Sequence, residues 1–104
     1  MKVFNKLVRD KIPQIIESNN ERCEVEILDE KTYLEKLNEK LQEEMKEYLE
    51  SGEVEELADL EEVLRAILSA KKVAYCDFEK IRLAKVEKRG AFEKRLFLKS
   101  TEEK

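Results

Sequence analysis

The stretch EEMKEYLESGEVEELAD, residues 43–59, predicts the end of one helix, a tight turn and the start of a second helix. Ser51-Gly52 is the expected turn, because glycine tolerates the left-handed backbone conformation that ends many helices. The two helices are expected over residues 30–50 and 53–72, where apolar residues recur with helical periodicity. Since the turn is so short, the two helices form an antiparallel hairpin.

This hairpin brings four carboxylates to facing positions. Residues at equal distances from the turn face each other, so Glu47 lies opposite Glu56. By the same rule, Glu44 lies opposite Asp59. At roughly 100° per residue, Glu44 lies about 60° from the centre of the apolar stripe of its helix. Glu56 lies inside the apolar arc of the second helix, so carboxylates are predicted at the contact between the helices.

Such a cluster of carboxylates needs compensation. Two carboxylates about 5 Å apart repel by roughly 3 kcal/mol at an effective dielectric constant of about 20. Raised pKa values, a basic side chain or a metal ion can each relieve this repulsion. Histidine is absent from the chain, so the ligands are all oxygen atoms and favour Mg²⁺ or Mn²⁺ over zinc or iron. The alternative is a solvated acidic helix face, because 44% of the residues are charged.

A basic segment precedes the hairpin. Lys6, Arg9 and Lys11 surround Asp10, which is a candidate cap for a short helix with Pro13 in its first turn. Cations at a helix N-terminus oppose the helix dipole. Binding of an anionic ligand would explain them, and a solvated helix start is the alternative.

Capping residues mark the ends of the other helices. The first hairpin helix begins after Asp29, or at Thr32 with Glu35 as a capping box. A fourth helix is expected from Asp77 to the residues just before Gly90. It ends at Lys88 or Arg89 and carries a basic stripe. The members of that stripe are Arg82, Lys85 and Arg89.

The expected fold is mainly α, an antiparallel helical bundle with a small β element. Residues 22–28 alternate between apolar and polar and predict a short strand, whose expected partner is residues 92–98. One domain is expected over residues 1–104, with a frayed tail at 99–104. The second hairpin helix is apolar over more than half its circumference, which one partner helix cannot cover. A homodimer or higher homo-oligomer is therefore expected.

Composition limits the classes of function. The formal net charge is −4, with 25 acidic and 21 basic residues interleaved, which argues against nucleic acid as a partner. We expect a cytoplasmic protein, because no signal peptide and no membrane-spanning apolar run are found. Cys23 and Cys76 match no metal-binding spacing and are expected to be ordinary reduced cysteines.

The carboxylate pattern resembles that of a known family. Glu43-Glu44-x-x-Glu47 followed by Glu56-x-x-Asp59 is similar to the EExxE…ExxD pattern of the all-α nucleoside triphosphate pyrophosphohydrolases, the MazG-type superfamily. The segments NKLVRDKIPQII and KRGAFEKRLFL resemble its small single-domain branch, described as phosphoribosyl-ATP pyrophosphohydrolase-like or house-cleaning nucleotide pyrophosphatases. The resemblance extends from Asn5 to Leu98. Ala91 departs from it, since a second glycine is expected there.

The resemblance implies an enzyme that cleaves a nucleotide between its α- and β-phosphates and releases pyrophosphate. The expected ligands of Mg²⁺ (or Mn²⁺) are Glu44, Glu47, Glu56 and Asp59. Glu43 or Glu47 is the expected general base, and the spacing does not choose between them. The expected phosphate-binding residues are Lys6, Arg9, Lys11, Lys85, Lys88 and Arg89. Two alternatives stay open: a non-catalytic helical dimerisation module and a nucleotide-sensing module.

Overall fold

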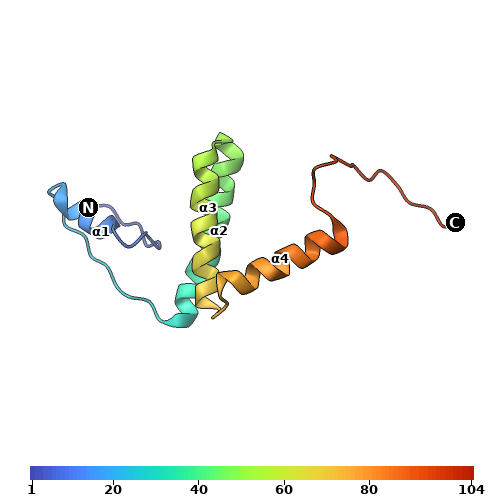
Figure 1. Cartoon of the computed structure of the whole chain (residues 1–104). Coiled ribbons are helices and arrows are strands. Elements are labelled where there is room, and N and C mark those ends of the chain that lie inside the picture. Colours follow the sequence, from blue (N-terminus) through green and yellow to red (C-terminus); the bar gives the residue numbers. More distant parts are fainter.

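The computed structural model describes residues 1–104 and contains four helices and no strand. The prediction of a mainly α protein is therefore confirmed. The helices are α1 (Ile12–Ser18), α2 (Glu30–Ser51), α3 (Val54–Ala70) and α4 (Tyr75–Arg89). Helices α2 and α3 stand side by side as the predicted hairpin in the centre of the molecule (Figure 1). None of the helices is both long and apolar enough to cross a membrane.

Local sequence fixes both ends of this hairpin. Asp29 is the N-cap of α2, and its carboxylate accepts a hydrogen bond of 2.7 Å from the Thr32 backbone N–H. Of the two predicted starts, the structure therefore selects Asp29. Gly52 ends α2 in the left-handed conformation with φ of 69°, and its N–H donates to the Tyr48 carbonyl. The Ser51 hydroxyl accepts a hydrogen bond of 3.1 Å from the Glu53 N–H and completes the turn.

The line along which α2 and α3 face each other, here called the hairpin seam, changes character along its length. Far from the turn it is apolar, with Leu37 of α2 and Val63 of α3 both buried. Nearer the turn the buried residue of α2 is Glu44, and Glu56 and Asp59 of α3 are half-buried. The apolar part of the seam thus holds together two helices that carry acids in the next turns.

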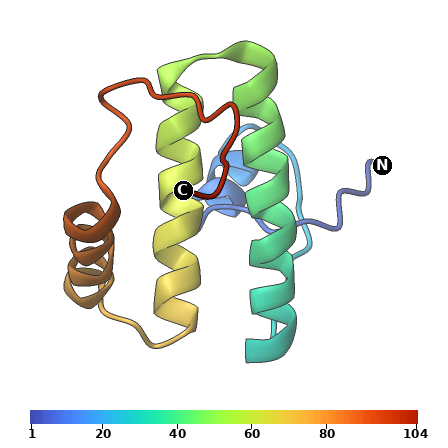
Figure 2. The same cartoon turned by 90° about the vertical axis from the view of Figure 1, so that its right-hand side faces the viewer.

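The remaining elements lie on either side of the hairpin. α1 makes no contact with another helix, whereas α4 meets α3 near their connection (Figure 1). There the Arg65 guanidinium stacks 4.0 Å from the centre of the Tyr75 ring, whose hydroxyl donates to Glu61 at 3.1 Å. Seen along the long direction of the molecule, the C-terminal segment lies in front of the hairpin and α1 lies behind it (Figure 2).

The predicted β element is not formed in the single chain. Residues 22–28 and 92–98 are both without regular structure. They lie on opposite sides of the hairpin (Figures 1 and 2), so neither offers the other the backbone partner that a strand needs. The period-two pattern describes side-chain alternation alone, and it contains no information about where a partner segment lies.

Two predicted helix caps are wrong by a few residues. The N-cap of α1 is Lys11 rather than Asp10, and no side chain bonds to the helix start. The N-cap of α4 is Ala74, and Asp77 lies in the first turn instead. An acidic residue is favourable in the first turn as well as at the cap, because both positions face the positive end of the helix dipole. Gly90 closes α4 as predicted.

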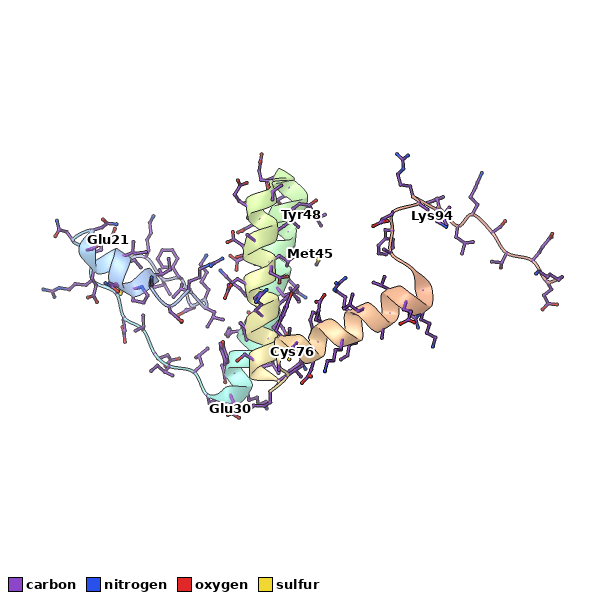
Figure 3. All side chains as sticks on the ribbon, in the orientation of Figure 1. Glu21, Glu30, Met45, Tyr48, Cys76 and Lys94 are labelled. Atoms are coloured by element: carbon purple, nitrogen blue, oxygen red, sulfur yellow. The ribbon has the colours of Figure 1, made fainter.

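The single chain is open and elongated. Its radius of gyration is 18.8 Å, and its extents are 67 × 31 × 21 Å. A compact chain of this length has a radius of gyration of about 13 Å. Met45 and Tyr48 lie on the side of the hairpin away from α1 (Figure 3), and Met45 is 48% exposed. Apolar surface of the hairpin therefore remains uncovered within one chain.

Truncation of the apolar seam should unfold the hairpin. Leu37→Ala is expected to lower the free energy of unfolding by about 2–4 kcal/mol, because Leu37 is the most buried side chain and leaves a cavity against α3. The matched control is Leu49→Ala, since Leu49 is on the same helix and 74% exposed. Urea unfolding followed by circular dichroism measures both changes. Equal losses in the two variants would contradict the assigned seam.

Candidate functional site

Five carboxylates gather near the turn of the hairpin, and we call this group the carboxylate cluster. Its members are Glu43, Glu44 and Glu47 of α2, and Glu56 and Asp59 of α3. Oxygen atoms of the three α2 residues lie within 4.8 Å of one another. Oxygen atoms of Glu44, Glu56 and Asp59 do the same across the two helices. Glu44 belongs to both groups, so it connects the two halves of the cluster.

Glu44 is the only buried charged residue of the chain, with 7% of its surface exposed. One of its carboxylate oxygens, Oε1, lies 3.5 Å from Lys40 Nζ. The other oxygen, Oε2, is buried without a hydrogen-bond partner. A buried acceptor without a partner costs about 1–3 kcal/mol, and more when it is charged. This oxygen therefore marks a place where a further cation or donor would be favourable.

The cluster raises the pKa of two of its members. The pKa of Glu44 is raised by desolvation first, and then by the neighbouring carboxyl of Glu47 and the charge of Asp59, while Lys40 acts in the opposite direction. The pKa of Glu56 is raised by desolvation and by the charges of Glu47 and Asp59. Raised pKa values at these two acids are the expected result of desolvation together with like charges held close to them.

The N-terminal basic segment, residues 6–11, lies against this cluster. Arg9 Nη2 is 2.6 Å from Asp59 Oδ1, and Lys6 Nζ is 3.5 Å from Glu43 Oε1. Both pairs are partly exposed, and such pairs contribute about 0.2–1 kcal/mol each. Lys11, of the same segment, lines a pocket that Arg9 and Asp59 also line. The segment predicted to bind an anion thus approaches the acids predicted to bind a metal.

A pocket of about 410 Å³ separates the N-terminal basic segment from the hairpin. Its size is within the range that binds small molecules, about 300–1,000 Å³. Its wall combines charged and apolar side chains. The charged residues are Arg9, Asp10, Lys11, Lys40, Glu44, Asp59 and Glu62. The others are Leu7, Val8, Tyr33, Leu37, Val63 and Ala66, so the wall includes one aromatic ring.

Sequence reasoning missed Lys40 and Tyr33 as site residues. Lys40 forms ion pairs with Glu43 at 3.7 Å and Glu44 at 3.5 Å. Its spacing of three and four residues from these acids was a usable indication. Tyr33 gave no such indication, because an aromatic residue on the apolar stripe of a helix is expected to lie in the hydrophobic core.

The structure does not bring the α4 cations to the cluster. Lys85, Lys88 and Arg89 are exposed on α4, which runs away from the hairpin (Figure 1). Arg82, of the same basic stripe, pairs with Glu79 of its own helix. Within one chain, the only cations that face the cluster are those of Lys40 and the N-terminal basic segment.

The donor set of the carboxylate cluster fits a hard divalent cation. Its ligand atoms are all carboxylate oxygens, which suit Mg²⁺ and Mn²⁺ and leave room for bound water. Glu44 Oε2 is buried without a hydrogen-bond partner and is therefore free to act as a metal ligand. This buried oxygen supports the fit independently of the number of acids.

Comparisons with protein-family models, with curated proteins and with solved structures found no match to this chain.

The repulsion within the cluster should appear in the pH dependence of stability. The pKa of Glu44 is raised on folding above its ordinary value of 4.5, so the folded chain binds more protons than the unfolded chain above that pH. Without metal, the free energy of unfolding should therefore decrease as pH rises from 4.5 through the raised pKa. Glu44→Gln should flatten this decrease.

Urea unfolding at several pH values in the presence of a chelator measures the effect. Asp29 and Glu79 have lowered pKa values and lose their contribution only as pH falls, so they do not produce a decrease above pH 4.5. Glu50→Gln, on the exposed surface of α2, is the matched control and should keep the wild-type slope. An identical slope in Glu44→Gln would contradict the assigned repulsion.

Proposed function

We propose that the chain is a Mg²⁺-dependent nucleotide pyrophosphohydrolase of the MazG-type all-α superfamily. It would hydrolyse a nucleoside triphosphate or a related nucleotide between the α- and β-phosphates. The observation that carries the proposal is the buried, unpartnered Oε2 of Glu44 within facing carboxylates of α2 and α3. The motif resemblance at Glu43-Glu44-x-x-Glu47 and Glu56-x-x-Asp59 supports the same reaction class.

The carboxylates have separate roles in this proposal. Glu44, Glu56 and Asp59 hold the ion, because their oxygens converge across the helices, and Glu47 completes the set from the same face of α2. When bound, Mg²⁺ would neutralise negative charge on the phosphate oxygens and lower the pKa of a bound water. Glu43 or Glu47 would accept the proton of the attacking water, since an oxygen atom of each lies within 4.8 Å of an oxygen of Glu44.

The pocket accounts for the rest of a nucleotide. Arg9 and Lys11 line it beside Glu44 and Asp59, where they would face phosphate oxygens. The Tyr33 ring, with its apolar neighbours on α2 and α3, offers a surface for a base or sugar. Lys6 does not line the pocket and lies 3.5 Å from Glu43 of the carboxylate cluster. A pocket wall that combines charged side chains with apolar ones and an aromatic ring fits a nucleotide better than a bare polyphosphate.

We further propose that the active form is a cytoplasmic homodimer or a higher homo-oligomer. A radius of gyration of 18.8 Å and the uncovered apolar side chains of the hairpin support association. In the oligomer, Lys85, Lys88 and Arg89 of one chain would approach the site of another. Residues 22–28 and 92–98 would pair there as the small β element, between chains.

Sedimentation equilibrium tests the association directly. We expect a mass of at least two chains of 12.3 kDa at micromolar concentration, because the apolar surface left exposed in one chain favours burial. A single-chain mass over the whole concentration range would contradict the dimer. That result would leave the site within the hairpin in place.

Glu56→Gln tests the function itself. Removal of this carboxylate should lower kcat/KM for pyrophosphate release at least about 100-fold, a loss of roughly 2.7 kcal/mol of transition-state stabilisation. Metal-free stability should stay level or rise, because a repelled charge is removed. Pyrophosphate release from a panel of nucleotides measures the activity, and calorimetric titration with MgCl₂ measures ion binding.

Glu55→Gln is the matched control, since Glu55 is the exposed neighbour of Glu56 on α3. It should keep both activity and ion binding. Absence of MgCl₂ heat in the wild type would favour a non-catalytic helical module. MgCl₂ binding without pyrophosphate release would favour a nucleotide sensor. Unfolding of Glu56→Gln would make Glu56 a structural residue.

A further inference from the structure

Few contacts attach the N-terminal basic segment to the hairpin. Residues 1–9 have no regular secondary structure, and α1 packs against no other helix. The polar attachments are the pairs of Arg9 with Asp59 and Lys6 with Glu43. Arg9 forms the closer pair, at 2.6 Å, and its side chain is 57% exposed. The polar part of this attachment is therefore weak and depends on the charge of the carboxylate cluster.

Asp59 cannot serve fully both as the ion-pair partner of Arg9 and as a metal ligand. Its carboxylate is the partner of Arg9, and it also belongs to the trio with Glu44 and Glu56 whose oxygens converge. A Mg²⁺ ion binds carboxylate oxygens at about 2.0–2.1 Å and keeps its own shell of water. The guanidinium and the ion would then be neighbouring positive charges on one side chain. Each therefore weakens the binding of the other at Asp59.

We propose that Arg9 takes the place of the metal ion at Asp59 when the metal is absent, and that metal binding releases Arg9 to contact the phosphates of the substrate. The inference depends on the proposed metal site and adds an order to it, in which the ion binds before the nucleotide. Arg9 is then a positioning residue in the metal-free chain and a phosphate-binding residue in the loaded one.

Three observations favour Arg9 for this role. It lies on the wall of the same pocket as Glu44 and Asp59, so its guanidinium is already beside the phosphate position. Its pair with Asp59 is partly exposed, so water can replace either partner at small cost. Lys6 is less suited, because its partner Glu43 also pairs with Lys40 at 3.7 Å and keeps a cation if Lys6 leaves.

Competition of this kind is reciprocal. If Arg9 weakens ion binding by some factor, the ion must weaken the attachment of Arg9 by the same factor. Loss of the guanidinium should therefore tighten ion binding, although it removes a positively charged residue that would help bind substrate. An arginine that merely anchored the segment at a distance from the ion site would not produce this pair of opposite effects.

The experiment uses the full chain with Val8→Trp as a reporter. The chain contains no tryptophan, and Val8 lines the pocket within the N-terminal basic segment. MgCl₂ alone should shift the tryptophan emission to longer wavelength, because opening of the Arg9–Asp59 pair loosens the segment and admits water to the pocket. In calorimetry, Arg9→Gln should bind MgCl₂ about two- to fivefold more tightly than the wild type, because a partly exposed ion pair is a competitor of about that strength. At saturating MgCl₂ it should bind inorganic pyrophosphate about tenfold more weakly.

Arg22→Gln is the matched control, because it removes one exposed arginine that forms no ion pair and does not line the pocket. Its MgCl₂ affinity should equal that of the wild type. MgCl₂ binding of equal strength in Arg9→Gln and wild type, with no change in emission, would overturn the inference and leave the metal site intact. Absence of MgCl₂ binding in every variant would remove both the inference and the proposed function.

Discussion

Repulsion among carboxylates at the hairpin seam is the constraint on which the rest of the structure depends. Glu44, Glu56 and Asp59 come together because the apolar turns around Leu37 and Val63 hold α2 against α3. The structure relieves the repulsion in each of the ways that electrostatics allows without a metal. The pKa of Glu44 is raised, so this carboxylate binds a proton more strongly. Lys40 forms an ion pair with Glu44 on the same helix, and Arg9 of the N-terminal basic segment forms one with Asp59. One oxygen of Glu44 still lacks a partner after all three.

The hairpin and its facing acids could be predicted because the information is local. A left-handed glycine at position 52 sets the turn, and a short turn fixes which residues face each other. The burial of the Glu44 side chain was predicted less well. A period of 3.6 places it on the shoulder of the apolar stripe, whereas two helices that coil around each other follow a repeat of 3.5. On that repeat Leu37, Leu41 and Glu44 share one line, and Glu44 is buried accordingly.

Apart from the two helix caps and Lys40, the wrong and missing predictions concern contacts between distant segments. Alternation in residues 22–28 says which side chains share a face but not where a partner strand lies, and in this chain residues 92–98 are on the other side of the hairpin. The position of Arg9 against Asp59 is of the same kind, since fifty residues separate them and no local pattern joins them. The direction of α4 depends on a few contacts around Tyr75, which the basic stripe of that helix does not reveal.

The choice of residues at the seam argues for a site over a simple dimerisation module. A hairpin that only had to be stable would carry an apolar residue at the buried position 44, and it would not need acids at the half-buried positions 56 and 59, because a buried charge commonly costs more than it returns. The chain has the lysines and glutamates to cover its surface elsewhere, so the acids at these positions are not required for solubility. Local departures from the rules of stable packing are expected where function demands them. Glu44 carries the largest cost, because one of its oxygens is buried without a hydrogen-bond partner. A bound cation would offset the free energy lost when this oxygen is removed from water.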